Sequence, residues 1–377
     1  MRDLVEIGMG RTARRGYALH EVEIVPSRRT RSSQDVSTAW QIDAYRFDIP
    51  LLTHPTDAVV SPAAAVEIGK LGGLGVLNAE GLWARHANVE QVLDQVVETL
   101  DDQDFTALTR LLQELHAAPI RPELIAEAIK KVTEAGVTAA ARVSPQRAGE
   151  LTPDLLAAGV EILVVQGTIV SAEHVSRNGE PLNLKNFIAD LDVPVIAGGV
   201  HDYRTAMHLM RTGAAGVIVG YGSGVASTTD SVLGIGAPMA TAIVDAAAAR
   251  RDYLDETGGR YVHVIADGEV DASGDIAKSI ACGADAVMLG APLAAAKEAP
   301  GKGLYWTASA AHPSLPRSRV IPAAAEDEIV DLRTLLFGPS ADPDGMINLF
   351  GALRRAMAKT GYSDLKEFQK VGLSVRG

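Results

Sequence analysis

The sequence predicts an α/β fold in which eight parallel strands alternate with helices and close into a barrel. Five segments repeat one pattern, in which a helix ends at a small residue and Gly, and a short β-branched run follows at once. Three more such runs begin after a turn. Apolar residues at successive positions indicate strands buried on both faces, which is typical of parallel sheets. Eight such units close a barrel more naturally than they form an open sheet, so we expect a (β/α)8 TIM barrel.

We expect the barrel strands at DIPLLT from Asp48, LGGLGVLN from Leu71, EAGVTAAARV from Glu134, AAGVEILVVQG from Ala157, VPVIAGG from Val193, TGAAGVIVG from Thr212, YVHVIADG from Tyr261 and CGADAVMLG from Cys282. Where Gly opens the run, it ends the preceding helix in a left-handed cap. Helical stretches fill the intervals, at 61–71, 122–135, 147–158, 202–212, 237–256 and 274–282. Pro238 suits the first turn of the helix from about 237, because proline is favoured there.

The remaining segments flank this barrel within a single domain of residues 1–377. Residues 1–47 precede the first strand and are expected to form an N-terminal arm. Six prolines interrupt the stretch from about 296 to 345, which indicates a flap-like insertion or lid. Over 346–377 we expect two amphipathic helices, which flank Thr360-Gly361.

Composition and charge exclude several kinds of partner. The formal charge of −12 would repel a polyanion, and the basic clusters at 14–15 and 28–31 carry no interleaved aromatics, so we expect no nucleic-acid partner. No apolar run suits a signal peptide or a membrane span, so we expect a cytoplasmic protein without membrane contact. The single cysteine, Cys282, stands where a helix runs into a buried strand, which indicates core packing rather than a nucleophile.

Candidate site residues follow from a rule for barrels: reacting groups lie at the carboxyl ends of the strands, and loops after the last two often hold phosphate. The run 220–229 follows the sixth strand, and its glycines leave backbone amides and carbonyls open to an ion or ligand. Asp267-Gly268 follows the seventh strand and Gly290-Ala291 the eighth. We expect the Asp267 carboxylate to accept hydrogen bonds from ribose hydroxyls, and nearby amides to hold a phosphate. The combination indicates a nucleotide.

Each of these features has a structural alternative. The glycines of 220–229 could form a tight turn, and Asp267 could cap a helix. A Rossmann fold is excluded, because no acidic residue ends a following strand at the usual spacing. The histidines lack the spacing of metal ligands, so we expect no metal site from His54, His201, His263 and His312. Among them, His201 is the one we expect at the barrel mouth.

Taken in order, these motifs resemble the IMP dehydrogenase / GMP reductase family over most of the barrel and the C-terminal helices. The matching segments are DIPLLTHPTDAVVSPAAAVEIGKLGGLGVLN, VPVIAGGVHDYRTAMHLMRTGAAGVIVGYGSG, VIADGEVDASGDIAKSIACGADAVMLGAPLA and GALRRAMAKTGYSDLKEFQKV. Val5 to Arg15 is similar to the start of stand-alone IMP dehydrogenase-related proteins. The paired CBS module that many relatives insert after the second strand is missing, which leaves only residues of roughly 79 to 120.

The resemblance assigns roles to individual positions. In the family, a cysteine after strand six attacks purine C2 and NAD removes hydride; Ser227 holds that position here, and no base is evident beside this weaker nucleophile. Thr229 matches as a second catalytic position. The nucleotide-binding positions are Gly222, Ser223, Gly224, Asp267, Gly268, Gly290 and Ala291. The carbonyls of Gly222 and Gly224 match those that help to bind potassium in relatives.

Several positions depart from the family pattern. Val225 and Ala291 replace phosphate-binding serines. Near the cofactor, Gln166 stands for an aspartate, Gly199 for an asparagine and, relative to some members, Ile218 for an arginine. The flap Arg-Tyr pair that activates water is not found, since 260–261 precedes strand seven. Binding positions therefore match better than catalytic ones.

The resemblance implies an oxidoreductase scaffold of GMP biosynthesis that acts on or binds a purine nucleotide, of the IMP, XMP or GMP class, with NAD(P). It also implies a homotetramer. Because Ser227 replaces the cysteine, one alternative is a catalytically silent nucleotide-binding paralogue that regulates or associates with IMP dehydrogenase. Another is an FMN-dependent barrel, since loops after strands seven and eight also suit a flavin.

Overall fold

All eight expected strands are present in one parallel sheet, in the order β6-β13-β12-β11-β10-β9-β8-β7. The computed structural model describes residues 4–100, 105–175 and 181–376. Leu52 forms a parallel bridge with Leu74, which closes the sheet between its first and last strands. The fold is therefore a (β/α)8 barrel. Its strands are β6 (Leu51–Thr53), β7 (Val76–Asn78), β8 (Ala140–Val143), β9 (Ile162–Gln166), β10 (Val195–Val200), β11 (Gly216–Ser223), β12 (His263–Gly268) and β13 (Ala286–Leu289).

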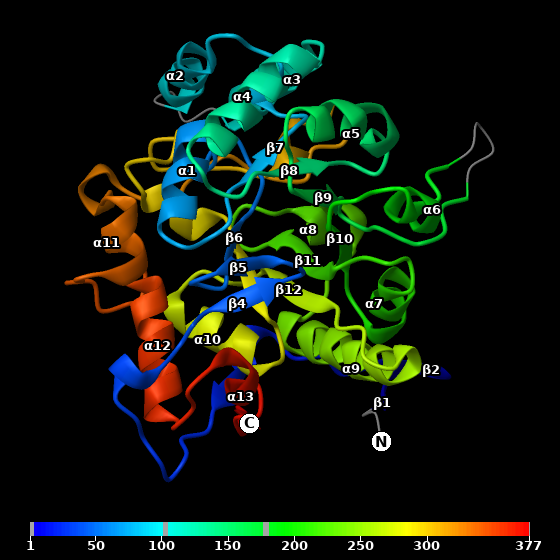
Figure 1. The fold of residues 1–377 in the computed structure, drawn as a ribbon, viewed down its shortest axis with the longest axis vertical. Helices are drawn as coiled ribbons and strands as arrows, with labels where there is room; N and C mark the ends of the chain where they lie inside the picture. The colour runs from blue at the N-terminus through cyan, green and yellow to red at the C-terminus, as the bar shows by residue number, and fades with distance from the viewer. Residues whose placement is uncertain (1–3, 101–104, 176–180, 377) are drawn as a thin grey trace.

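Helices surround the sheet, as Figure 1 shows. The six predicted ones are α1 (Pro62–Lys70), α4 (Pro122–Glu134), α5 (Ala148–Ala157), α7 (Tyr203–Met210), α9 (Met239–Thr257) and α10 (Ser273–Ala281). Pro238 immediately precedes α9 instead of standing in its first turn. Further helices, which the repeat did not predict, are α2 (Val89–Leu100), α3 (Phe105–Ala117), α6 (Leu184–Ala189), α8 (Thr229–Leu233) and α11 (Leu332–Phe337).

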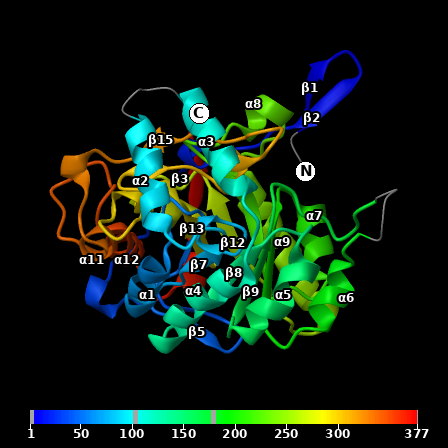
Figure 2. The ribbon, with the colours of Figure 1, turned by 90° about the horizontal axis from the view of Figure 1, so that it is seen from above.

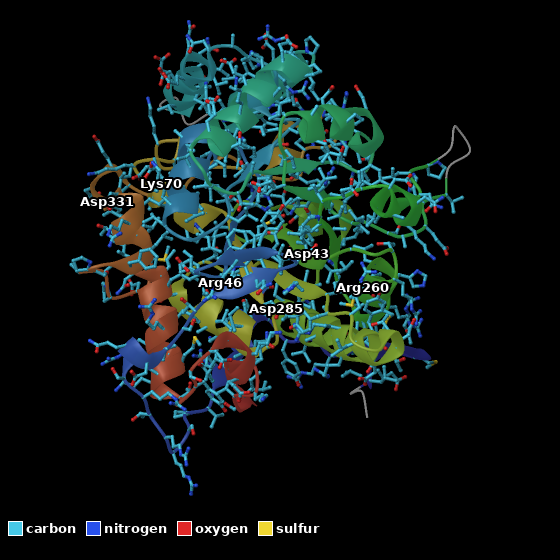
Figure 3. All side chains as sticks on the ribbon, in the orientation of Figure 1. Asp43, Arg46, Lys70, Arg260, Asp285 and Asp331 are labelled. Carbon is cyan, nitrogen blue, oxygen red and sulfur yellow. The ribbon has the colours of Figure 1, made fainter. Side chains whose placement is uncertain are left out.

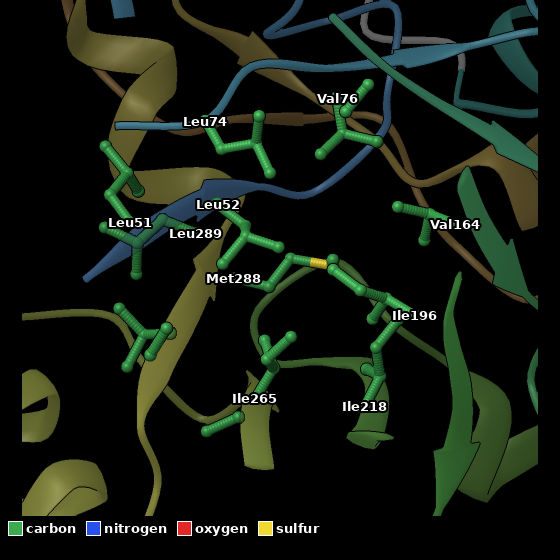
Figure 4. Close-up of a cluster of buried hydrophobic side chains, with 14 of the residues drawn as sticks. Leu51, Leu52, Leu74, Val76, Val164, Ile196, Ile218, Ile265, Met288 and Leu289 are labelled. Atoms are coloured by element: carbon green, nitrogen blue, oxygen red, sulfur yellow. The ribbon is translucent and has the colours of Figure 1, made fainter. Parts of the chain in front are cut away.

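Apolar side chains fill the inside of the barrel. Leu52, Ile196, Ile218, Ile265 and Met288 come from different strands and point toward one another there (Figure 4). Each is at most 2% exposed. The interior is thus a packed core rather than a pore, and the strand ends and the loops that follow them remain for chemistry.

The segment before the first strand is an extended arm only in part. β1 (Leu4–Gly8) and β2 (Arg11–Arg14) form an antiparallel hairpin that projects from the body (Figure 2). β3 (Val22–Ile24) pairs with β16 (Leu373–Val375) near the C-terminus. β4 (Trp40–Ile42) and β5 (Tyr45–Phe47) form a second hairpin, whose Trp40, Ile42 and Phe47 side chains are buried.

This second hairpin lies at the floor of the barrel, where the strands begin. Asp43, Arg46 and Asp285 line a cavity there (Figure 3). The buried Asp285 carboxylate accepts hydrogen bonds from Arg250 at 2.6 Å and from the Tyr261 hydroxyl at 2.6 Å. Because Asp285 is paired with neighbouring side chains and this end lies opposite the carboxyl ends of the strands, we interpret the floor as the structural end of the barrel.

The proline-rich stretch from 296 to 345 packs on the barrel. β14 (Leu304–Tyr305) pairs with β15 (Ile321–Pro322), and Trp306 is only 1% exposed. Gln113 of α3 donates to the His312 carbonyl at 2.8 Å, so the 79–120 interval holds this stretch from outside. The C-terminal helices are α12 (Leu349–Lys359) and α13 (Leu365–Phe368), as predicted. Within the described ranges, no helix has the length and apolar character to cross a membrane.

Candidate functional site

Three glycine turns meet at the carboxyl end of the barrel. Gly222 lies near the end of β11, and Gly224 begins the next loop. Gly268 ends β12, and Gly290 follows β13. All four line one small cavity beside Asp267. The turns after strands six, seven and eight therefore lie together. Their shared cavity is about 20 Å³, which is room for about one water molecule.

The glycines of the first turn are needed for its backbone shape and its packing. Gly222 and Gly224 have φ of +71° and +154°, in the region that favours glycine. A Cβ on Gly222 would lie 2.6 Å from the His54 ring, so the imidazole packs directly on this turn. The Ser223 side chain lies outside the described part of the structure, and the potassium site stays a prediction.

Asp267 is a buried carboxylate with two side-chain partners. It is 2% exposed, and its two oxygens lie 3.0 and 3.2 Å from Nδ1 of His54. A carboxylate only accepts hydrogen bonds, so Nδ1 carries the proton. Nε2 of Gln166 donates to the second oxygen at 2.7 Å. Asp267 caps no helix, since the N-cap of α10 is Ala272.

This network separates two cavities. Asp267 lines the small cavity between the glycine turns, whereas His54 and Gln166 line a much larger one of about 760 Å³. We call the larger space the mouth cavity. Its volume lies in the range of pockets that hold small molecules and cofactors. The donors on Asp267 therefore stand between a corner with room for one water molecule and a much larger space.

Polar and basic side chains from several loops line the mouth cavity. They come from the ends of β7, β8 and β9 and the loops that follow, from α3 and from the stretch after β14, and they include Asn78, Glu80, Arg85, His116, Arg142, Arg147, Thr168, Ser309, His312 and Arg317. Arg142 is held in place, because its Nη2 donates to the Gln166 carbonyl at 2.7 Å. Burial lowers the pKa of the Arg142 guanidinium, and the nearby Glu80 opposes that shift.

Ser227 lies on the loop between β11 and α8 and lines neither cavity, although the preceding Ala226 lines the small one. Its hydroxyl donates to Oγ1 of Thr229 at 3.2 Å. The loop is held by the proline-rich stretch, since the Thr228 amide donates to the Arg317 carbonyl and the Arg319 amide to the Ala226 carbonyl, both at 2.9 Å. No base of the described residues hydrogen-bonds to the Ser227 hydroxyl, which stays a poor nucleophile.

Ser227 lines a third cavity, of about 450 Å³. The acidic side chains Glu21, Asp230 and Glu269 line it as well. Burial raises the pKa of Glu269 above its ordinary value. Carboxylates around this space disfavour a phosphorylated ligand. Gly224 lines both this cavity and the small one, whereas Ser227 lines only the third cavity of these three.

The positions that the family uses for the cofactor are filled differently. The side-chain amide of Gln166 donates a hydrogen bond to Asp267. A Cβ on Gly199 would lie 1.8 Å from the Gly220 carbonyl oxygen, so no side chain fits there. Ile218 is fully buried in the barrel core. The cofactor-binding role of Gln166 and Gly199 stays a prediction, and Gln166 lines the mouth cavity.

The remaining predicted residues lie in different parts of the structure. Val225 is 57% exposed, and Ala291 lines the small cavity without a hydroxyl to offer. His201 packs edge-on against Tyr221 and has no hydrogen-bond partner on either ring nitrogen among described residues. Burial lowers the pKa of His201. Cys282 is buried, and burial raises its pKa to about 11, as expected for a packing residue.

Sequence reasoning missed His54, Tyr305 and the arginines of the mouth cavity. His54 directly follows β6, so the strand-end rule that selected Asp267 would also have found it. Tyr305 lies in the small cavity next to Gly290, and burial raises its pKa. Nothing in the spacing of the prolines around it signals this position. Within the described residues, no three His, Cys, Asp or Glu side chains are grouped to hold a metal ion.

Comparison with known proteins identifies the family of the chain. Residues 16–312 match the model of the IMP dehydrogenase / GMP reductase domain. The chain is 66% identical to an uncharacterized oxidoreductase of Mycobacterium tuberculosis over 378 residues, which covers 99% of this chain and 100% of that protein. It is 35% identical to the inosine-5'-monophosphate dehydrogenase of Aquifex aeolicus over 247 residues, or 60% of this chain and 48% of that enzyme.

A solved structure extends the match to the whole fold. The IMP dehydrogenase/GMP reductase-like protein of Corynebacterium glutamicum superposes with a TM-score of 0.94 at 56% identity, and the match covers 99% of this chain and 98% of that one. The barrel, the three glycine turns and the family match point the same way. The chain belongs to the IMP dehydrogenase / GMP reductase family.

Proposed function

We propose that this oxidoreductase-family chain binds a purine nucleoside monophosphate, with the phosphate on the three glycine turns and the ribose at Asp267. The observation that carries the proposal is the shared cavity of Gly222, Gly224, Gly268 and Gly290 beside that carboxylate. Backbone amides at such turns are suited to phosphate, and a buried carboxylate is suited to two sugar hydroxyls. Phosphate binding by backbone amides does not depend on the serine side chains that Val225 and Ala291 replace.

Binding requires two local changes. Ribose hydroxyls would take over the hydrogen bonds that His54 and Gln166 now donate to Asp267, which exchanges donors without leaving the buried carboxylate bare. The small cavity would widen by an outward movement of the 224–228 loop, where Val225 is already 57% exposed. Both changes leave the barrel itself intact.

We further propose that the chain does not carry out the cysteine-dependent dehydrogenation of its relatives. The Ser227 hydroxyl bonds to Thr229, and no base of the described residues hydrogen-bonds to it. Ser227 lines the third cavity and neither the small cavity nor the mouth cavity. A nicotinamide cofactor, when bound, would accept or supply hydride. Gly199 and Ile218 cannot provide the family contacts to it, and the mouth cavity, at about 760 Å³, has room for it.

A thermal-shift panel with IMP, XMP, GMP, NAD, NADP and FMN tests the proposal. A ligand at 100 times its dissociation constant should add about 2.7 kcal/mol to the free energy of unfolding. We expect stabilisation by at least one purine monophosphate, no NADH formation from IMP and NAD at 340 nm, and colourless protein without flavin absorbance. Silence with every purine monophosphate would reject the nucleotide site, and steady NADH formation would reject the second proposal.

A further inference from the structure

Apolar side chains gather on the β1–β2 hairpin, which projects from the body of the molecule (Figure 2). Leu4 and Ile7 are each 66% exposed, and Met9, at the turn between the two strands, is fully exposed. Exposed apolar residues are ordinary when they are scattered, but these lie within six consecutive positions. A two-stranded hairpin is marginally stable in water unless it packs against something. The hairpin therefore has the properties of a docking element.

The base of the hairpin is fixed to the barrel. Arg14 forms an ion pair with Asp245 of α9, in which Nη2 lies 3.0 Å from Oδ1. Three residues later, the Tyr17 amide donates to Oγ1 of Thr241 at 2.7 Å. These two anchors fix the point at which the hairpin leaves the body, so its exposed part is presented at a defined place.

The hairpin is basic, although the whole chain carries a formal charge of −12. Arg11 of β2 is exposed, and it forms no hydrogen bond or ion pair with any described residue. Glu6 is the one acidic residue of the two strands. Arginine and methionine are both enriched in protein interfaces. An unpaired guanidinium beside apolar side chains favours a protein surface that is itself apolar and negatively charged.

A surface of that kind lies on the rim of the third cavity. The stretch 232–238 leads from the end of α8 to α9 and contains no charged residue, and its Val232 and Leu233 side chains are each 40% exposed. Asp230 precedes this stretch on α8 and lines the cavity. None of the carboxylates that line the cavity forms an ion pair with a Lys, Arg or His of the described residues. We call Asp230, Val232 and Leu233 the α8 rim.

We propose that the β1–β2 hairpin of one copy docks on the α8 rim of a second copy of this chain. The apolar side chains of the hairpin pack on Val232 and Leu233, and Arg11 pairs with Asp230 at the edge of the cavity. The contact forms between copies because both surfaces are exposed in the single chain, so the hairpin does not cover its own rim. Shape apart, the two surfaces match in both apolar character and charge.

Each copy offers one hairpin and one α8 rim. Exchange between copies uses both surfaces, either reciprocally in a dimer or around a closed ring, and leaves no hairpin free. The neighbour then supplies a positive charge to the acidic cavity that Ser227 lines, so this cavity is complete only in the assembly. The contact uses no residue of the proposed nucleotide site and does not depend on nucleotide binding.

Cross-linking between two separately purified full-length proteins tests the contact. Met9→Cys with an affinity tag is mixed with untagged Val232→Cys and treated with a short bismaleimide, which joins two nearby thiols. We expect a tagged–untagged dimer on a denaturing gel, about tenfold more abundant than in a mixture of Met9→Cys with Val175→Cys, because docking raises the local thiol concentration. The control side chain, Val175, is 91% exposed. Cys282 is buried and present in every mixture, so it sets the background.

Charge exchange measures the strength of the same contact. In sedimentation of the intact protein over a concentration series, Arg11→Glu and Asp230→Arg should each weaken association about tenfold, because an attractive charge pair becomes a repulsive one. The double variant restores an opposite pair and should return to within about threefold of wild type. Arg28→Glu makes the same charge change at an exposed position outside the hairpin and should associate as wild type does.

Four outcomes would overturn the proposal. They are wild-type protein that stays monomeric at every concentration, an assembly that forms without the mixed cross-link, cross-links between two Met9→Cys copies in place of the mixed ones, and a double charge variant as weak as the single ones. Equal weakening in Arg28→Glu would also overturn it, since net charge would then explain the effect. None of these results bears on IMP affinity, so the proposed function is tested separately.

Discussion

A buried carboxylate is stable only when its oxygens are hydrogen-bonded, and Asp267 meets this requirement through His54 and Gln166. Asp267→Ala would orphan both donors, so we expect the free energy of unfolding to fall by about 2 kcal/mol. Nucleotide binding should be lost as well. Asp255→Ala, at an exposed position, should change stability by less than about 0.5 kcal/mol. Wild-type nucleotide affinity in Asp267→Ala would contradict the role given to this residue.

Ser227→Cys restores the thiol but not its surroundings. The side chain would still face the acidic third cavity and still lack a base, and Gly199 and Ile218 would be unchanged. We expect no NADH formation from IMP and NAD, followed at 340 nm, and no covalent adduct by intact-protein mass spectrometry. Robust turnover would show that the thiol alone was missing.

The candidate site was predictable where its residues end a strand. Asp267, Gly268 and Gly290 follow apolar runs, so the barrel rule places them at the mouth. Arg85 and Arg317 come from an insertion and a proline-rich stretch whose path over the mouth no local pattern encodes. The pairing of Asp267 with Gln166 joins residues 101 positions apart, and only the closed barrel brings them together.

At the scale of elements, the strands were predictable because each buried run is continuously apolar and most follow a helix-ending Gly. Helices α6 and α8 are short, at 6 and 5 residues, too short to show a period. The sequence predicted an extended arm and did not indicate the β4–β5 hairpin. This hairpin is short, and it takes its stability from packing on the barrel floor. Tertiary contacts decide the conformation of such segments.

The approach of β10 to β11 gives an element-scale prediction. Gly199→Asn would restore the family's asparagine, but its Cβ would meet the Gly220 carbonyl oxygen at 1.8 Å. Because the clash is with backbone, we expect a loss of about 3 kcal/mol or failure to fold, measured by thermal denaturation. Gly149→Ala, in α5 with nothing within 4 Å of its Cβ, should instead be neutral or stabilise by up to about 1 kcal/mol. A Gly199→Asn protein as stable as wild type would refute this packing.

At the scale of the whole molecule, stability should depend on pH through the barrel floor. Burial against Trp40 and Tyr261 lowers the pKa of His263. The nearby Asp285 and Asp43 carboxylates oppose this shift, whereas Lys366 and Arg250 add to it. In the unfolded chain the histidine has a pKa of about 6.5, so around and below this pH the unfolded chain binds a proton that the folded chain does not bind. Below about pH 6.5 the free energy of unfolding should decrease as the pH falls, down to the pKa of the folded state.

His263→Gln removes this contribution. Between pH 7.5 and 5.5, we expect the melting temperature of the variant to fall less than that of wild type, measured by calorimetry. Burial raises the pKa of Glu269 and Asp271, but both are present in each protein, so the comparison isolates His263. His20→Gln, at an exposed position, should follow the wild-type curve. Parallel curves for wild type and His263→Gln would refute the linkage.

The central claim concerns a phosphate on three converging turns, and calorimetric titration with IMP and with inosine tests it most directly. The two ligands share base and sugar and differ only in the phosphate. If the turns of β11, β12 and β13 hold that group, IMP should bind at least about 100-fold more tightly than inosine, a difference of about 2.7 kcal/mol. Equal affinities for nucleotide and nucleoside, or tighter binding of inosine, would contradict the account.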